Sequence, residues 1–97
     1  DWMDIQHVER DGRGGFLLRD EEGKRVGELM YVTSGDTSIT IDHTEVDPEL
    51  RGKGVATKLL RHVVQYARNN HLKIRATCPF ALKKLQEGPE FGDVFIA

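Results

Sequence analysis

Two hydrophobic periods meet in the middle of this chain, and their meeting point limits the folds open to it. Over Ser38–Val46 the residues are rich in β-branched side chains and alternate in polarity, as in a β-strand. Over Val55–Asn70 apolar residues recur at spacings of three and four, which is typical of an amphipathic helix. The loop between them contains Gly52 and Gly54. The chain therefore predicts a strand that leads through a short glycine loop into a helix.

This loop has the chemistry of an anion site. Gly52 and Gly54 have no Cβ, so the backbone can approach a ligand closely. The first N–H groups of a helix lack internal partners, and the helix dipole places partial positive charge there. Arg51 and Lys53 add full positive charges. We expect a phosphate group to bind here; the alternative interpretation is a glycine turn before a surface helix.

Two common phosphate loops do not match these residues. A Walker A loop would need a glycine where Thr57 precedes Lys58, and Ser or Thr where Leu59 follows it. A dinucleotide-binding fingerprint would need its third glycine at Thr57. The pattern present is R-x-x-G-x-A, formed by Arg51, Gly54 and Ala56.

The remaining segments predict an α/β (α+β) domain that spans residues 1–97. Turn residues separate four strands, which are expected at Ile5–Glu9, Phe16–Arg19, Arg25–Val32 and Ser38–Val46. After the helix we expect a fifth strand at Lys73–Cys78, a helix over 79–87, and a tail from Glu90 that adds a strand or lies irregular. The order is ββββαβα. The strand–helix–strand unit implies parallel pairing of the fourth and fifth strands in a mixed, mostly antiparallel sheet.

The order of elements and the loop together resemble the GNAT acyltransferase superfamily. The R-x-x-G-x-A pattern, preceded by Val46 and Pro48, is similar to its coenzyme A pyrophosphate loop. The usual two helices after the first strand have no room here, so the chain resembles the minimal GNAT-like subfamily of roughly a hundred residues. The resemblance implies acetyl-coenzyme A as cofactor. It implies a binding site made of Val46, Arg51, Gly52, Lys53, Gly54, Val55, Ala56 and Thr57, where Val46 contacts the pantetheine arm through its backbone.

The last helix departs from the usual superfamily pattern. Cys78 stands where an asparagine commonly begins the helix, and Leu85 stands where a tyrosine commonly protonates the leaving thiolate. The minimal subfamily likewise carries a cysteine at this position, which implies a reactive residue. Cys78 would be a nucleophile or a polar contact near the coenzyme sulfur; the alternative is a buried structural cysteine.

His43 and Glu45 are candidates for the general base. A lysine amine has a reference pKa of about 10.4, so only about 1 in 2,500 is neutral at pH 7. Strand alternation places His43 and Glu45 on one face, and Asp42 and Thr44 on the other. Either candidate could equally be an ordinary strand residue. The other histidines (His7, His62 and His71) show no ligand spacing with Cys or acidic residues, so we predict no metal site.

Charge is divided unevenly along the chain. Residues 1–50 carry 5 Lys/Arg and 13 Asp/Glu, a net −8, whereas residues 51–97 carry 9 and 3, a net +6; together these give the overall −2. The basic half begins at the anion loop, where it would attract coenzyme A. A chain that is not basic overall, with no basic stripe interleaved with aromatic residues, is a poor candidate for nucleic-acid binding.

Location can also be anticipated. No apolar run approaches the roughly 20 residues that span a bilayer, so we expect no membrane segment. The segment Asp1–Asp4 does not resemble a signal peptide, and a single cysteine forms no internal disulfide. These features favour the cytoplasm.

The function that the resemblance implies is acetyl transfer from acetyl-coenzyme A to an amine of a protein tail, a lysine or a small polyamine. Two alternatives stay open: a coenzyme A-binding module with little catalysis, and a small interaction domain whose anion loop is incidental. The residues do not distinguish among acceptors or oligomeric states.

Overall fold

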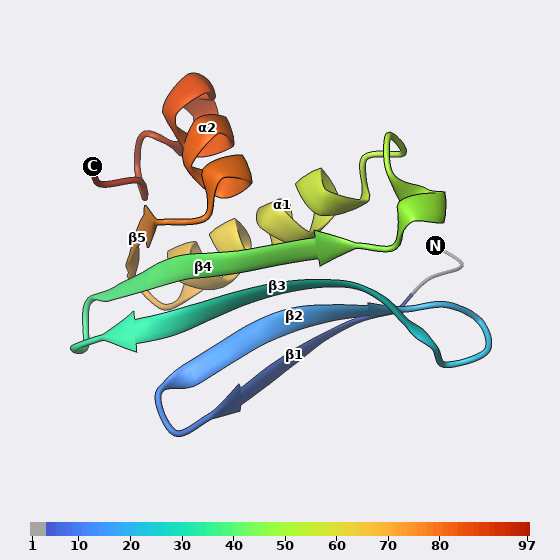
Figure 1. The fold of residues 1–97 in the computed structure, drawn as a ribbon. Helices are drawn as coiled ribbons and strands as arrows, with labels where there is room; N and C mark the ends of the chain where they lie inside the picture. The colour runs from blue at the N-terminus through green and yellow to red at the C-terminus, as the bar shows by residue number, and fades with distance from the viewer. Residues whose placement is uncertain (1–3) are drawn as a thin grey trace.

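A computed structural model describes residues 4–97 as a five-stranded sheet with two helices (Figure 1). Asp1–Met3, most of the segment used to assess a signal peptide, lie outside the described residues. The elements in order are β1 (Asp4–Arg10), β2 (Arg13–Arg19), β3 (Arg25–Ser34), β4 (Ser38–Val46), the 3-10 turn η1 (Pro48–Leu50), α1 (Val55–Asn69), β5 (Lys73–Ala76), α2 (Pro79–Glu87) and the 3-10 turn η2 (Pro89–Phe91). No helix in this part of the chain is long and apolar enough to cross a membrane.

The sheet has the predicted mixed topology. Its order is β1-β2-β3-β4-β5, with antiparallel pairing from β1 to β4 and parallel pairing of β4 with β5. Within residues 4–97 no α-helix precedes α1, as the resemblance implies. Figure 1 shows α1 behind the sheet and α2 beyond the β5 edge, with the other face of the sheet uncovered. We call this uncovered side the open face.

One continuous core lies between the sheet and the helices. Buried side chains of β2, β3 and β4 meet those of α1 and α2 there, and the apolar stripe of α1 predicted from its spacing supplies much of the contact. The sheet residues of this core include Phe16, Leu18, Leu29, Tyr31, Ile39 and Ile41. The helices are thereby fixed against the strands that carry the loop.

Three boundaries differ from the sequence expectation by two or three residues, and one of them is the end of β3, which lies at Ser34 instead of Val32. β2 begins at Arg13 instead of Phe16, because Gly14 and Gly15 are paired strand residues opposite Tyr31 and Met30. β5 ends at Ala76, two residues early. The tail is irregular with one strand-like bridge, since the Ile74 N–H donates to the carbonyl of Val94.

The early end of β5 separates it from β4. The two strands pair only from Ser38–Lys73 to Ile41–Ala76. The N–H groups of Thr77 and Cys78 then both donate to the carbonyl of Ile41, at 2.9 and 3.2 Å, and the chain turns into α2. β4 continues to Val46 with β3 as its only strand partner among residues 4–97. Residues 42–46 therefore present an unpaired edge beside the start of α2.

A β-bulge interrupts β4 at Asp42. Met30 pairs with His43 and Tyr31 pairs with Ile41, so Asp42 is the extra residue. Its carboxylate accepts from Arg13 at 2.9 Å. Arg13 pairs with Val32, which shares a face with Met30. The expectation that Asp42 lies with Thr44 on the opposite face from His43 is therefore wrong, because the bulge breaks the alternation.

Gly14 offers a test of this packing. A Cβ at position 14 would lie 2.5 Å from Cζ of Tyr31, whose side chain is buried and whose hydroxyl contacts His7 at 2.6 Å. Burial, with Tyr66 and Glu9 nearby, also raises the pKa of this hydroxyl, so it stays protonated.

We predict that Gly14→Ala lowers the free energy of unfolding by about 1–3 kcal/mol through overpacking. The control is Gly92→Ala, where the nearest atom to the added Cβ is 3.5 Å away and φ is −61°; it should change stability by no more than about 0.5 kcal/mol. Urea unfolding measures both. Equal stabilities of the two variants would contradict the packing described.

Candidate functional site

A hollow of about 310 Å³ lies at the start of α1, between β4 and α2. Seven of the eight residues predicted to hold a cofactor line it, whereas Lys53 is exposed and lies outside the lining. The lining residues are Val46, Leu50, Arg51, Gly52, Gly54, Val55, Ala56, Thr57, Phe80 and Lys84. The fold thus gathers the predicted loop, the end of β4 and the first turns of α2 around one space, which we call the helix-side hollow.

The backbone of the loop leaves donors free at this hollow. Gly52 and Gly54 have φ of 80° and 79°, a region that favours glycine. Gly54 is the N-cap of α1, and its carbonyl accepts the first helical hydrogen bond, from Lys58 at 3.0 Å. Within the described chain no hydrogen bond is formed by the N–H groups of residues 54–57. These four donors, at the positive end of the helix dipole, fit an anionic phosphate.

Side chains add positive and apolar surface. The Arg51 guanidinium is exposed, and its Nε lies 3.4 Å from the carbonyl oxygen of Val46. Lys84 and Phe80 reach the same hollow from α2. Neither side chain was predicted from the sequence as part of the site. The available signal was their i,i+4 spacing on a short helix, which places them on one face.

Cys78 lies at the other side of the separation between β4 and β5. It is the N-cap residue of α2, is 8% exposed, and its Sγ lies 3.4 Å from Oγ1 of Thr44. Thr44 lies in the stretch of β4 that has no strand partner on the β5 side. On its other edge it pairs with the core residue Leu29 of β3. The thiol is therefore beside that edge, on the helix side of the sheet.

His43 and Glu45 share one face of β4, as predicted, and this is the open face, where a third residue joins them. Nε2 of His43 is 2.8 Å from Oε2 of Glu28 and 3.6 Å from Oε1 of Glu45. Glu28 comes from β3, directly opposite Glu45. No hydrogen bond links Cys78 with His43 or Glu45 in the described chain. β4 thus directs Thr44, which contacts the Cys78 thiol, to the helix side of the sheet, and His43 to the open face.

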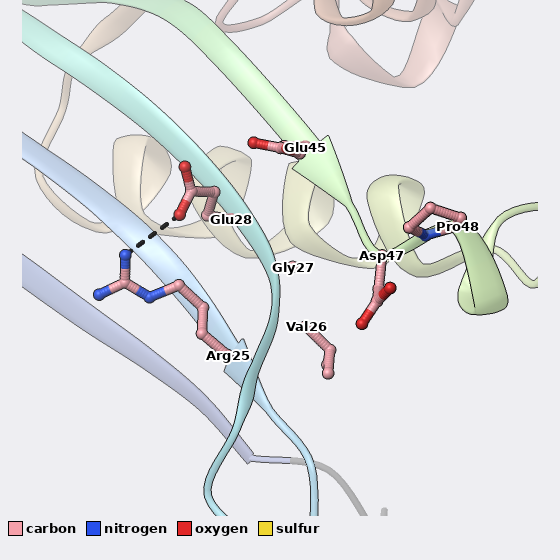
Figure 2. Close-up of a pocket in the computed structure, with 7 residues that line it drawn as sticks. All are labelled: Arg25, Val26, Gly27, Glu28, Glu45, Asp47 and Pro48. Atoms are coloured by element: carbon pink, nitrogen blue, oxygen red, sulfur yellow. Dashed lines mark hydrogen bonds and ion pairs between the residues drawn. The ribbon is translucent and has the colours of Figure 1, made fainter.

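A second hollow, of about 290 Å³, lies beside this group (Figure 2). Its lining includes three carboxylates, those of Glu28, Glu45 and Asp47. Figure 2 shows Arg25 directed to Glu28, and the two form an ion pair at 3.2 Å. Lys24 also pairs with Asp47, at 3.6 Å. The lining itself carries three carboxylates and one guanidinium, and this net negative charge favours cations in the hollow, which we call the open-face hollow.

The ligand atoms of Glu28, His43 and Glu45 lie within 4.8 Å of one another, close enough to face a single metal ion. No metal site was predicted from the sequence, because the spacing of histidines and acidic residues along the chain does not reveal this group. Glu28 is supplied by a neighbouring strand, a contact that spacing does not report.

Comparisons with known proteins agree with this architecture. The family model described as GCN5-related N-acetyl-transferase matches residues 15–94. The NMR structure of a GCN5-like protein from Staphylococcus aureus is 37% identical, with a TM-score of 0.74 over 95% of this chain and 88% of that one. A GNAT family acetyltransferase from Elizabethkingia anophelis, solved with acetyl-CoA bound, is 13% identical, with a TM-score of 0.65 over 76% of this chain and 63% of that one, and so shares the fold.

Curated relatives are matched over part of their length. Streptothricin acetyltransferase A of Bacillus subtilis is 31% identical over 71 residues, which are 73% of this chain and 40% of that protein. The protein NATD1 of Xenopus tropicalis is 31% identical over 61 residues, 63% of this chain and 56% of that protein. The chain thus spans about half the length of these relatives. The family match extends over most of the chain, which therefore belongs to the GCN5-related N-acetyltransferase family.

Proposed function

We propose that this member of the GCN5-related N-acetyltransferase family binds acetyl-coenzyme A in the helix-side hollow and transfers the acetyl group to an amine that arrives from the open face. The observation that carries the proposal is the separation of β4 from β5. It leaves an unpaired strand edge whose consecutive residues Glu45 and Val46 line the two hollows. A cofactor on one side and an acceptor on the other would meet at this edge.

The free donors fit the cofactor. The N–H groups of residues 54–57 and the Arg51 guanidinium would bind the pyrophosphate. The backbone of Val46 would pair with the pantetheine arm, as the family resemblance implies. Bound acetyl-coenzyme A supplies an activated thioester. Lys53 does not line the helix-side hollow, so we propose that it only attracts the anionic cofactor at long range.

Three side chains are proposed to act on the reacting groups. His43 or Glu45 would take a proton from the acceptor ammonium, which must be neutral to attack. Cys78 would lie at the thioester end of the arm, as acyl carrier or as a polar contact. Leu85 is buried and apolar, so it cannot replace the tyrosine that commonly protonates the thiolate.

The acceptor is proposed to be a cationic amine, on a protein tail, a lysine or a small polyamine. Carboxylates line the open-face hollow, and no helix covers it in the described chain. Coulombic attraction would draw an ammonium group there, while the absence of walls would admit a large acceptor.

A coenzyme A-binding module with little catalysis is the second candidate. Leu85 at the usual tyrosine position and the uncovered acceptor side favour it. Thiol release from acetyl-coenzyme A, measured across a panel of amines, separates the two. If no amine accelerates thiol release while coenzyme A still binds, the result would favour the coenzyme A-binding module.

We predict that Gly54→Val weakens coenzyme A binding about 10- to 100-fold, the equivalent of one lost charge-assisted hydrogen bond. The added side chain strains a φ of 79° at the N-cap of α1, so the loop that presents the free N–H groups would be distorted. Arg51→Ala should weaken binding by about fivefold or less, because the backbone supplies most contacts. Isothermal titration measures both.

Gly35→Val is the matched control for Gly54→Val. Gly35 also has a positive φ, of 66°, with no atom within 4 Å of an added Cβ, and it lies in the β3–β4 turn at the opposite end of the sheet. It should leave the affinity unchanged. Equal affinities of the two folded valine variants would remove the loop from the coenzyme site.

We also predict that association with coenzyme A slows as ionic strength rises. The screening length falls from about 10 Å at 0.1 M to about 3 Å at 1 M salt, which weakens attraction by the basic half of the chain. Stopped-flow measurement across this range should show a decreasing association rate. A constant rate would mean that the uneven charge does not serve the cofactor.

Bound coenzyme A should protect Cys78 from alkylation. It is the single cysteine, so intact mass reports its modification directly. Cys78→Ala should lower turnover more than cofactor affinity. An acyl-carrier role predicts an acetyl adduct from acetyl-coenzyme A without acceptor, and a contact role predicts protection without adduct. Identical alkylation rates with and without saturating coenzyme A would exclude Cys78 from the site.

A further inference from the structure

We infer that Glu28 is a positioning residue that fixes the tautomer of His43, so that Nδ1 is the nitrogen left to accept a proton. This inference rests on the proposed function for its catalytic meaning, and it gives a role to a residue that the sequence did not single out. Glu28 lies on β3 and reaches His43 across the β3–β4 pair.

The hydrogen bond sets the protonation pattern of the imidazole. Oε2 of Glu28 is 2.8 Å from Nε2 of His43. A carboxylate only accepts hydrogen bonds, so the Nε2 atom must carry the hydrogen. In a neutral imidazole Nδ1 then has the free lone pair. The same partnership of a carboxylate with one imidazole nitrogen orients histidine in catalytic triads and at metal sites.

Glu28 is itself held in place. Its other oxygen, Oε1, accepts from Nη1 of Arg25 at 3.2 Å. The Glu28 side chain is 22% exposed, compared with 68% for Glu45. A side chain already held by one partner, here Arg25, loses less entropy when it orients a second group, here His43. Glu28 therefore has the rigidity that a positioning residue needs.

The other charged groups near His43 do not compete for this role. Oε1 of Glu45 is 3.6 Å from Nε2, beyond hydrogen-bond distance, and it faces the same nitrogen. The neighbouring carboxylate of Asp42, on the same face of the sheet, is held by Arg13 at 2.9 and 3.2 Å. Among the described residues, Glu28 alone forms a hydrogen bond with the His43 ring.

The resulting step balances. Nδ1 of His43 takes one proton from the acceptor ammonium. The imidazolium keeps its other hydrogen on Nε2, from which it donates a hydrogen bond to Glu28. The freed amine nitrogen attacks the thioester carbonyl carbon of acetyl-coenzyme A. A C–N bond forms and the C–S bond breaks. The second amine proton leaves with the thiolate, giving the amide and the free thiol.

The test reads the tautomer and the kinetics separately. Nitrogen-15 NMR of the unliganded protein at a pH where His43 is neutral should show hydrogen on Nε2 in the wild type. Glu28→Gln should weaken this preference, because an amide can donate as well as accept. Glu45→Gln should retain it, because the Glu45 oxygen lies 3.6 Å away.

Turnover should follow the tautomer. Glu28→Gln should lower kcat about 10- to 100-fold, with the KM for acetyl-coenzyme A unchanged; this is at or below the lower end of a full general-base contribution, because the imidazole itself remains. Glu28→Asp, which keeps the carboxylate, should recover part of that loss. Glu22→Gln, at an exposed turn position, is the activity control.

Hydrogen on Nδ1 in the wild type would overturn the inference whatever the activity. So would a Glu28→Gln protein with wild-type tautomer and wild-type kcat. If the wild type acetylates no amine but shows the Nε2 hydrogen and loses its preference in Glu28→Gln, the hydrogen-bond assignment stands and the proposed function is what fails.

Discussion

The separation of β5 from β4 after Ile41 is the constraint on which the rest of the site depends. The Ile41 carbonyl accepts from two successive N–H groups, Thr77 and Cys78, and Pro79 then begins α2. Proline suits a first helical position because its missing N–H would be unpaired there anyway. Had β5 continued beside β4, strand pairing would have filled the edge that faces both hollows. A short strand and an early helix thus create the site.

The two hollows beside this separation also differ in charge, in line with the uneven distribution of charge along the chain. The acidic first half supplies β1 to β4, and its carboxylates at Glu28, Glu45 and Asp47 line the open-face hollow. The basic second half supplies α1 and α2, with Arg51 and Lys84 at the helix-side hollow. An asymmetry along the sequence becomes an asymmetry across the sheet. Under the proposed function, an anionic cofactor and a cationic acceptor would be attracted to opposite sides of one strand.

Local patterns in the sequence predicted much of this architecture. The alternation over Ser38–Val46 and the helical spacing from Val55 are strong periodic signals, and the structure assigns β4 and α1 almost as predicted. The glycine loop was recognisable because its positions require positive φ and an approachable backbone. The family and the fold could therefore be inferred from the sequence.

Contacts between strands could not be predicted in this way. The bulge at Asp42 depends on the register between β3 and β4, which no residue in β4 specifies by itself. Glu28 reaches His43 only through that register, and the Thr44–Cys78 contact joins residues 34 positions apart. Strand alternation correctly placed His43 with Glu45 but could not reveal the partner that binds the ring. Pairwise register was the missing information.

Under the proposed function, the uncovered open face has a consequence for acceptor specificity. A site without walls buries little apolar surface of its ligand, so it gains little from shape. Charges remain partly effective at such a surface, since their interaction falls slowly with distance and depends on screening. If the open face admits the acceptor as proposed, its carboxylates would be the main source of selection, and they would select for positive charge more than for size. Among cationic amines, deprotonation for acetyl transfer would then depend on Nδ1 of His43, the single imidazole nitrogen that Glu28 leaves free.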